Sequence, residues 1–181
     1  MQQNNSFDKV YFEHRIMVFN LALHYVLNVE DAEEITQDVF IKVYESMEKF
    51  NQNSSLKTWI YRITVNKSLD YIKHKNSKKR FYIFGKKSSS EKEYLNTASY
   101  EHPAALLENK EKSAILFEAI NTLPDNQKTA FLLSKLEGLG NAEVAQIMEI
   151  NIGAVESLQF RAKKTLRNNL GQKFEEYRRK K

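Results

Sequence analysis

Chain-breaking residues are scarce in this sequence, which has five glycines and two prolines among 181 residues. Turns depend heavily on these two residue types, so a meander of short strands would lack most of the turn chemistry that it needs. Apolar residues instead recur every three or four positions, the spacing of one face of an α-helix. The sequence therefore predicts an all-α protein of long helices, and its length allows one or two small domains.

Charge is arranged in blocks along the chain. Residues 1–56 carry 4 Lys/Arg and 9 Asp/Glu, whereas residues 57–87 carry 10 and 1. The pattern then repeats, since residues 88–150 carry 5 and 10, and residues 151–181 carry 9 and 3. Two basic zones, each preceded by an acidic one, indicate two contacts with polyanions and at least one different partner. The alternative interpretation is that these charged residues only form solvated helix faces and bind no partner.

Several function classes are excluded or disfavoured by the composition. The sequence contains no cysteine, which excludes disulfides, thiolate catalysis and cysteine zinc sites. The four histidines are scattered and form no HExxH motif, so we expect no metal and no cofactor. No enzyme signature is evident in the sequence, and we expect no enzyme activity. The N-terminus lacks the pattern of a signal peptide, and the apolar stretch 16–27 is too short and too interrupted to span a membrane. We expect a cytoplasmic protein without membrane insertion.

Two N-terminal helices are predicted, separated by a break at residues 28–30. The first covers about residues 7–27, and its apolar residues at helical spacing are Ile16, Phe19, Leu23 and Leu27. Asp31 is expected to cap the second helix, with further acidic residues in the first turn. The expected inward face of that helix consists of Ala32, Ile35, Val39 and Val43, and the expected outward face of Glu34, Gln37, Asp38, Lys42 and Glu45.

A basic helix with the single tryptophan of the chain follows a polar loop. The loop, FNQNSS, spans residues 50–55, and the helix is expected to start near Leu56 and to run to about Lys75. One helix face combines an aromatic ring, cations and an amide, a mixture that suits nucleic-acid bases and phosphates. Its members are Trp59, Arg62, Asn66, Asp70 and Lys73. For Trp59 the alternative is a core residue that anchors the loop.

Residues 81–110 differ in composition from the rest of the chain. They mix Ser, Gly, Lys and Glu, and no helical period is sustained before Ala104. A structureless loop of this length inside one compact domain would be unusual. We therefore predict two small helical domains, residues 1–80 and 111–181, joined by a flexible linker.

The second domain is predicted to contain a helix-turn-helix. The tripeptide LPD at residues 123–125 breaks the chain and opens a helix, and Asn141 is expected to cap the next one. Ala145 is small enough for two helices to cross closely, and residues 152–169 would form the groove-entering helix. The contact is expected to bury Val144, Met148, Ile150, Val155 and Leu158, and the outer cations are Arg161, Lys163, Lys164 and Arg167. The alternative is an ordinary helical hairpin with a basic end.

Motifs in both halves of the chain resemble those of the extracytoplasmic-function (ECF) sigma factors. Residues 31–80, with DAEEITQDVFIKVYE and TW-x-YRI-x-x-N-x-x-x-D, are similar to region 2 of that family. Residues 116–170, with LPDNQKTAFLL and a helix-turn-helix ending in FRAKKTL, are similar to region 4. The motifs occur in the family's order and cover most of the chain. The resemblance implies two helical domains that bind core RNA polymerase and read two promoter elements.

Four sets of site residues follow from this resemblance. The family's polymerase-binding surface, which meets the clamp helices of the largest subunit, corresponds to Glu34, Gln37, Asp38, Ile41 and Glu45. The loop that captures a flipped base of the minus-ten element corresponds to Asn51, Gln52, Asn53, Ser54, Ser55 and Leu56. The helix that meets the melted strand corresponds to Lys57, Trp59, Arg62, Asn66 and Lys73. The residues that read the minus-thirty-five element correspond to Glu156, Ser157, Phe160, Arg161 and Lys164.

The sequence departs from the family's pattern in the helix-turn-helix. Glu156 and Leu158 stand where basic residues are usual, and Glu149 stands where the turn usually has glycine. A carboxylate accepts a hydrogen bond from a cytosine amine but repels phosphate. These departures therefore bear on the DNA sequence that the helix reads and not on the fold.

The implied function is that of a sigma factor, which directs core RNA polymerase to specific promoters and promotes their opening. The implied partners are the clamp of the largest polymerase subunit, the flap of the second subunit and promoter DNA. An anti-sigma factor is a common partner in the family, and the sequence does not identify one. Two alternatives remain open: a helix-turn-helix regulator that acts without polymerase, and a structural adaptor that joins proteins. The helix face formed between Trp59 and Lys73, which suits nucleic-acid bases, argues against both alternatives.

Overall fold

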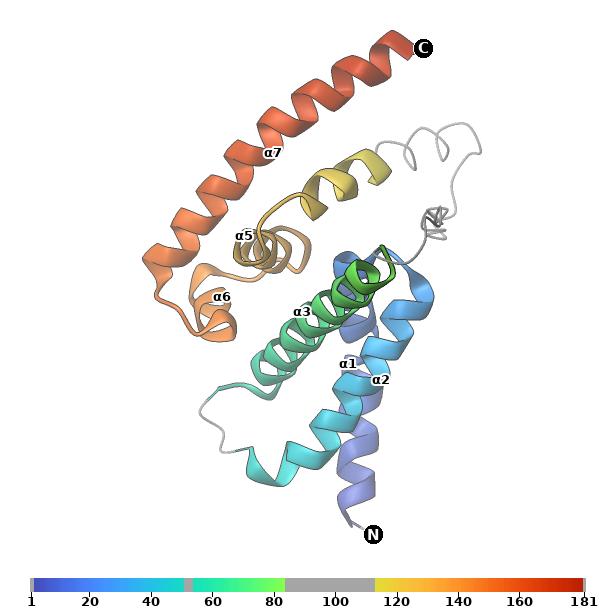
Figure 1. Cartoon of the computed structure of the whole chain (residues 1–181). Helices are drawn as coiled ribbons and strands as arrows, with labels where there is room; N and C mark the ends of the chain where they lie inside the picture. Colours follow the sequence, from blue (N-terminus) through green and yellow to red (C-terminus); the bar gives the residue numbers. More distant parts are fainter. Residues whose placement is uncertain (1, 51–53, 84–112, 181) are drawn as a thin grey trace, which may run out of the picture. The chain divides into compact units, whose positions relative to one another are not determined.

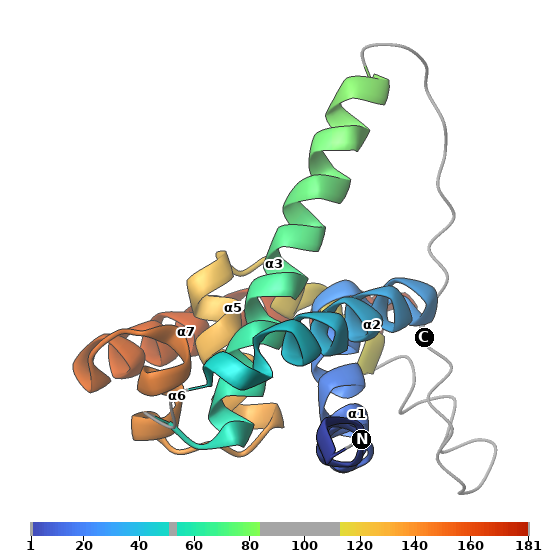
Figure 2. The same cartoon turned by 90° about the horizontal axis from the view of Figure 1, so that it is seen from below.

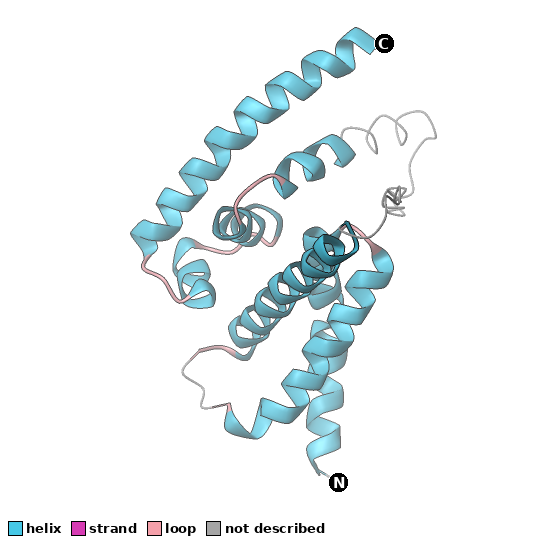
Figure 3. Cartoon of the chain, viewed as in Figure 1, coloured by secondary structure: helices cyan, strands magenta, loops and turns pink. Residues whose placement is uncertain are grey.

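The computed structural model describes residues 2–50, 54–83 and 113–180. All regular secondary structure in these ranges is helical (Figure 3). The chain divides into two compact units, unit 1 (Met1–Glu93) and unit 2 (Tyr94–Lys181). The predicted all-α fold with two helical groups is confirmed. Residues 84–110 of the predicted linker lie outside the described residues, and its first three residues belong to the last helix of unit 1.

Unit 1 is built from three helices that pack against one another: α1 (Gln2–Val26), α2 (Val29–Ser46) and α3 (Leu56–Ile83) (Figure 1). A short 3₁₀ turn, η1 (Met47–Lys49), ends α2. The expected inward face of α2 is confirmed, because Ala32, Ile35, Val39 and Val43 are all buried. The buried residues that α1 and α3 add to this core include Val18, Leu21, Tyr25, Ile60, Tyr61 and Val65.

The apolar residues at helical spacing in α1 are not all buried, since Leu23 is 9% exposed whereas Ile16 is 66% exposed. The buried face of α1 instead runs through Val10, His14, Val18 and Leu21, at spacings of three and four residues. His14 is buried although it is polar, and burial lowers the pKa of its imidazole because the charged form is poorly solvated there. Ile16 matches a helical period as well, but on the opposite face.

The connection between α1 and α2 is tighter than predicted. Leu27 adopts a left-handed conformation with φ of 54°, and its N–H donates to the carbonyl of Leu23 at 2.8 Å. Asn28, not Asp31, caps α2, because its side-chain oxygen accepts from the backbone N–H of Asp31 at 2.8 Å. Asp31 therefore lies within the first turn of α2, where a negative charge also stabilises the helix.

α3 is longer than predicted, since it continues beyond Lys75 to Ile83. Lys and Arg are good helix formers, and the first helix breaker after this region is Gly85. Among the α3 side chains whose burial is described, those up to residue 77, Ser68 is the last buried one, and residues 73–77 are exposed. The end of α3, beyond Lys75, accordingly projects beyond α1 and α2 (Figure 2).

Unit 2 consists of a helical segment over residues 113–121, followed by α5 (Asp125–Phe131), α6 (Asn141–Met148) and α7 (Ile152–Lys180). A π-helical stretch, η2 (Leu132–Leu136), extends α5. α7 packs against both α5 and α6, and the predicted helix-turn-helix of α6 and α7 is confirmed. The buried residues of unit 2 include Ala119, Ile120, Leu132, Leu133, Val144, Ala145, Val155 and Ala162.

The ends of the two helices in this motif differ from the prediction. Gly140, not Asn141, is the residue that precedes α6, and its N–H donates to the Glu143 carboxylate at 2.9 Å. Asn151 caps α7, because its side-chain oxygen accepts from the N–H of Ala154 at 2.7 Å. α7 continues beyond the predicted end at residue 169. Met148, Ile150 and Leu158 are half-buried, whereas Val144 and Val155 are fully buried as expected.

The turn of the helix-turn-helix holds a strained residue. Glu149 ends α6 in the left-handed conformation, with φ of 56° and ψ of 40°. This is the backbone geometry that glycine adopts freely and that other L-residues adopt at a cost. The turn conformation is therefore imposed on Glu149 by the crossing of α6 and α7 rather than favoured by the residue itself.

Replacing Glu149 by glycine is expected to stabilise unit 2. The left-handed conformation costs a residue with a Cβ about 1–2 kcal/mol, part of which glycine loses again through the greater entropy of its unfolded chain. We expect Glu149→Gly to raise the free energy of unfolding of unit 2 by about 0.5–1 kcal/mol. Urea unfolding of the full chain, followed by far-UV circular dichroism, measures this change.

Glu149→Gln is the matched control, because it removes the charge and keeps the Cβ. Its free energy of unfolding is expected to stay within about 0.5 kcal/mol of the parent. Trp59 is the only tryptophan, so its fluorescence reports the unfolding of unit 1 and is expected not to change. Identical stabilities of the two variants would contradict the strain at residue 149.

Candidate nucleic-acid and protein interfaces

The outward face of α2 is exposed at all five predicted contact positions. Glu34, Gln37, Asp38, Ile41 and Glu45 share this face, and Ile41 is 57% exposed. Tyr44 lies next to Ile41 along the helix and is 54% exposed, although its ring also contacts that of Phe7 edge-on at 5.1 Å. Sequence analysis missed Tyr44, even though its spacing of three residues from Ile41 could have indicated it. The face thus has an apolar centre bordered by carboxylates.

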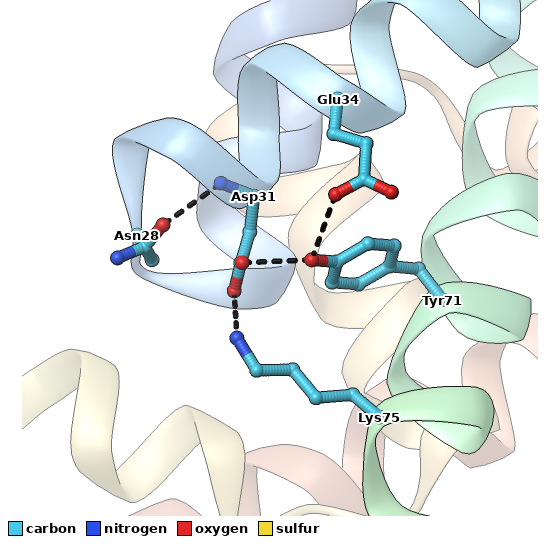
Figure 4. A network of polar contacts seen from close by, with 5 residues as sticks. All are labelled: Asn28, Asp31, Glu34, Tyr71 and Lys75. Atoms are coloured by element: carbon cyan, nitrogen blue, oxygen red, sulfur yellow. Dashed lines mark hydrogen bonds and ion pairs between the residues drawn. The ribbon is translucent and has the colours of Figure 1, made fainter. Parts of the chain in front are cut away.

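A polar network joins the start of α2 to the middle of α3 (Figure 4). The Tyr71 hydroxyl lies 2.7 Å from Asp31 Oδ1 and 3.2 Å from Glu34 Oε2, and its single proton favours the nearer carboxylate. Lys75 forms an ion pair with the other oxygen of Asp31. Burial and the two carboxylates raise the pKa of Tyr71 far above its usual value, because a phenolate there would be poorly solvated and would meet negative charge. The network fixes the acidic face of α2 relative to α3.

Asp38 forms a weaker contact with α3. Its carboxylate lies 3.6 Å from Lys67 Nζ, and both side chains are at least one-third exposed. Solvent screens an ion pair of this kind, so it contributes about 0–1 kcal/mol to stability. Asp38 therefore remains available to a partner.

An open pocket of about 540 Å³ lies beside the polar loop of unit 1. It is lined by Met47, Phe50, Ser54 and Leu56. Among the predicted loop residues, Asn51, Gln52 and Asn53 lie outside the described residues, whereas Ser54, Ser55 and Leu56 are described. Ser55 caps α3, because its hydroxyl oxygen accepts from the N–H of Thr58 at 3.0 Å. The start of α3 is thereby fixed at one side of the pocket.

The predicted strand-binding face of α3 divides into two parts. Trp59 and Arg62 are half-buried, and the Trp59 ring lies 5.0 Å from that of Phe50, tilted by 35°. Asn66 and Lys73 are exposed, and Lys73 is 4.0 Å from the Asp70 carboxylate. The contact with Phe50 favours the alternative interpretation of Trp59 as the residue that anchors the loop, while Asn66 and Lys73 are free to face a ligand. Lys57, also predicted, is exposed above the Tyr61 ring at 5.8 Å.

The exposed side of α7 brings together all the predicted reading residues. Glu156, Ser157, Phe160, Arg161 and Lys164 are exposed, and Phe160 is exposed over 70% of its surface. Ile152, which sequence analysis missed, is 48% exposed one turn before Glu156. Lys163 and Arg167 are exposed as well. A helix that follows a tight turn and carries cations beside exposed polar and apolar groups suits the major groove of DNA.

Lys128 is a buried cation in α5. Its side chain is 5% exposed, and its ammonium group donates to the side-chain oxygen of Asn121. Burial lowers the pKa of Lys128 to about 8, and the attraction of Asp125 only partly opposes this effect. The lysine therefore ties α5 to the preceding helical segment at an electrostatic cost.

The described residues do not suggest metal chemistry or a membrane span. Within ranges 2–50, 54–83 and 113–180, no group of three or more His, Asp or Glu side chains could hold a metal ion. None of the helices in these ranges is long and apolar enough to cross a bilayer. The exposed surfaces of α2, α3 and α7 remain the candidate sites. Together they define a helical DNA-binding protein with a helix-turn-helix and a separate acidic surface.

Comparison with known proteins assigns the chain to one family. Residues 10–78 match the family described as Sigma-70 region 2, and residues 113–166 match Sigma-70, region 4. The chain is 31% identical over 154 residues to the ECF RNA polymerase sigma-E factor of Haemophilus influenzae, over 84% of this chain and 81% of that protein. It is 29% identical over 170 residues to the ECF RNA polymerase sigma-E factor of Escherichia coli K12, over 89% and 83% of the two chains.

Two solved structures share the fold. One is the sigma factor RpoE from Bartonella quintana in complex with the anti-sigma factor NepR, with a TM-score of 0.68 at 19% identity over 92% of this chain and 97% of that chain. The other is CnrH in complex with the cytosolic domain of CnrY, with a TM-score of 0.65 at 20% identity over 93% and 90%. The protein belongs to the ECF sigma factors. As a non-enzymatic subunit, it directs RNA polymerase to promoters for the initiation of transcription, which excludes both alternatives considered from the sequence.

The buried Lys128 predicts a pH dependence of stability. The unfolded chain keeps the Lys128 proton up to a pH of about 10.5, whereas the folded chain keeps it only up to about 8. Between these values the unfolded state binds more protons, so the free energy of unfolding rises with pH, by up to about 3 kcal/mol. Comparing the urea unfolding of the parent with that of Lys128→Met from pH 7.5 to pH 10 isolates this rise, which the variant is expected to lack.

Lys135→Met is the control for this comparison, because it removes an exposed lysine from the same unit. This variant is expected to keep the rise of the parent. The explanation fails if Lys128→Met follows the same pH profile as the parent.

Proposed function

We propose that three surfaces of this sigma factor bind different partners during the initiation of transcription. The outward face of α2 binds the clamp of the largest polymerase subunit. The pocket lined by Met47, Phe50, Ser54 and Leu56 holds the melted strand of the minus-ten element, together with the exposed Lys57, Asn66 and Lys73 of α3. The outer side of α7 reads the minus-thirty-five element as duplex, while unit 2 meets the flap of the second subunit.

The composition of the α2 face is the observation that carries the polymerase contact. Protein interfaces combine an apolar centre, often aromatic, with a polar rim. On α2 the exposed Ile41 and Tyr44 provide such a centre, and Glu34, Asp38 and Glu45 provide charges around it. Two large apolar side chains exposed next to each other favour a contact surface over a face that only meets solvent. Its negative charge implies a basic partner surface.

The strand contact is supported by the lining of the pocket and by the exposed amide of Asn66 further along α3. Extruding a base from a duplex costs a few kcal/mol, which a binding pocket has to recover. The pocket is lined by the apolar residues Met47, Phe50 and Leu56 together with the polar residue Ser54, so its composition suits both the flat face and a polar edge of a base. Asn66 offers both a donor and an acceptor to an unpaired base.

A regulatory partner is also proposed. RpoE of Bartonella quintana was solved with the anti-sigma factor NepR, and CnrH was solved with the cytosolic domain of CnrY. By analogy, an anti-sigma factor binds this chain and keeps it from the polymerase. Such control takes place in the cytoplasm, where the polymerase acts.

Reversing the charge of Asp38 is expected to weaken binding to core polymerase while unit 1 stays folded. A like charge placed against a complementary surface costs several kcal/mol, so Asp38→Arg is expected to lower the affinity at least tenfold. Loss of the exposed pair with Lys67 changes stability by less than about 1 kcal/mol. Titration of fluorescently labelled protein with core polymerase measures the affinity, and Trp59 fluorescence during unfolding measures the stability.

Two variants serve as controls for Asp38→Arg. Asp38→Asn removes the charge without reversing it, and a smaller loss of affinity is expected. Glu13→Arg reverses an exposed charge on α1, outside the proposed surface, and is expected to bind as the parent does. Parent-like polymerase affinity of folded Asp38→Arg would rule out this face of α2 as the clamp contact.

Removing the Asn66 amide is expected to impair promoter opening and to spare recruitment. One hydrogen bond to an unpaired base contributes about 0.5–1.5 kcal/mol, so the open fraction should fall by about twofold to tenfold in Asn66→Ala. Permanganate reactivity of thymines in the polymerase–promoter complex measures opening. A template that is already melted is expected to restore transcription.

Asn76→Ala is the matched control, because Asn76 is an exposed amide further along the same helix. It is expected to open promoters as the parent does. Equal opening by the two variants, or a failure of the melted template to rescue folded Asn66→Ala, would exclude the strand contact at Asn66.

A further inference from the structure

The groove-entering end of α7 presents an acidic group between two apolar ones. Ile152, Glu156 and Phe160 follow one another at a spacing of four residues, so they form a line along one side of the helix. All three are exposed, Ile152 over 48% and Phe160 over 70% of the side chain. Phosphates repel a carboxylate, so Glu156 weakens any contact that is made only with the DNA backbone.

A side chain of the neighbouring helix α6 binds the carboxylate of Glu156. Asn141, the first residue of α6, donates its side-chain N–H to Glu156 Oε1 at 3.4 Å. The side-chain oxygen of Asn141 in turn accepts from Gln159 at 3.0 Å. One amide thus joins two residues of α7 across the turn. In the described part of the chain, the contacts of Glu156 involve only Oε1, which leaves Oε2 for a donor outside the protein.

The major groove offers two kinds of amine donor to such an acceptor. Adenine N6 lies between two acceptors, its own N7 and the O4 of the paired thymine, and both repel a carboxylate. Cytosine N4 has an acceptor on one side only, the O6 of the paired guanine. A carboxylate has no donor to offer to these acceptors, so it favours cytosine. The apolar Ile152 and Phe160 flank Glu156 along the helix, one turn on either side.

We propose that Glu156 reads one cytosine of the duplex promoter element through its free carboxylate oxygen, and that Asn141 is a positioning residue that orients Glu156. The proposal rests on the proposed function of α7 and adds the base that one of its positions selects. Cytosine preference at this position is expected to be about tenfold, within the range of a single well-placed base contact.

Selection from a promoter library with a randomised minus-thirty-five region tests the proposal. The holoenzyme formed from the full chain and core polymerase is bound to the library, and the retained duplexes are sequenced. The parent is expected to select cytosine at one position about tenfold. Glu156→Ala is expected to lose this preference at that position alone, and Glu156→Gln is expected to shift it to adenine, which an amide contacts with both donor and acceptor.

Two further variants separate reading from folding and from backbone contact. Asn141→Ala is expected to reduce the cytosine preference severalfold without changing the preferences at other positions. Lys164→Ala is expected to weaken binding nearly uniformly across sequences and to lower the slope of log affinity against log salt by about 0.9, the signature of one phosphate contact. Circular dichroism of each variant verifies that unit 2 is folded.

The outcomes distinguish this proposal from the function on which it rests. If the parent holoenzyme selects a sequence and folded Glu156→Ala selects the same cytosine to the same extent, Glu156 does not read it and only the further inference is overturned. If the parent holoenzyme shows no selection in this region, the assignment of α7 to the promoter element is overturned, and the inference with it.

Discussion

The burial of one side of α2 is the constraint on which the exposed acidic face of this helix depends. Ala32, Ile35, Val39 and Val43 are almost fully removed from water between α1 and α3. Because side chains leave a helix in fixed directions, burying this side forces the residues between them outward. The network of Asp31, Tyr71 and Lys75 then fixes the rotation and height of α2 against α3. The core and the exposed acidic face of α2 are thus two consequences of the same helical repeat.

In unit 2 a single helix, α7, contributes both to the core and to the exposed surface. α7 buries Val155, Ala162 and Leu166 against α5 and α6, and it exposes Glu156, Phe160 and Arg161 on the other side. The crossing of α6 and α7 requires a tight turn, which Glu149 forms in a strained conformation. The buried ammonium of Lys128 is a second unfavourable feature of the same unit. Glu149 and Lys128 therefore both lower the stability of unit 2, and neither residue is on the exposed face of α7.

The sequence predicted the interior of each helix well and the ends poorly. Apolar spacing is a local property that repeats several times, so Val39 or Val155 could be assigned to the core without the structure. A cap depends on where one residue leaves the helical conformation, which is why Asn28 and Gly140, not Asp31 and Asn141, precede α2 and α6. Exposed apolar residues such as Ile16, Tyr44 and Ile152 resemble core residues in sequence, and only packing distinguishes them. The polar loop at residues 51–53 lies outside the described residues.

The length of α3 has a consequence for where the helix ends. At about 1.5 Å per residue, its 28 residues extend for roughly 42 Å from the pocket to Ile83. Ile83 therefore lies at the tip of a stalk, far from the pocket that Leu56 lines. Removing one turn of α3 beyond Lys75 would withdraw this tip by about 5 Å while leaving the pocket and the outward face of α2 intact.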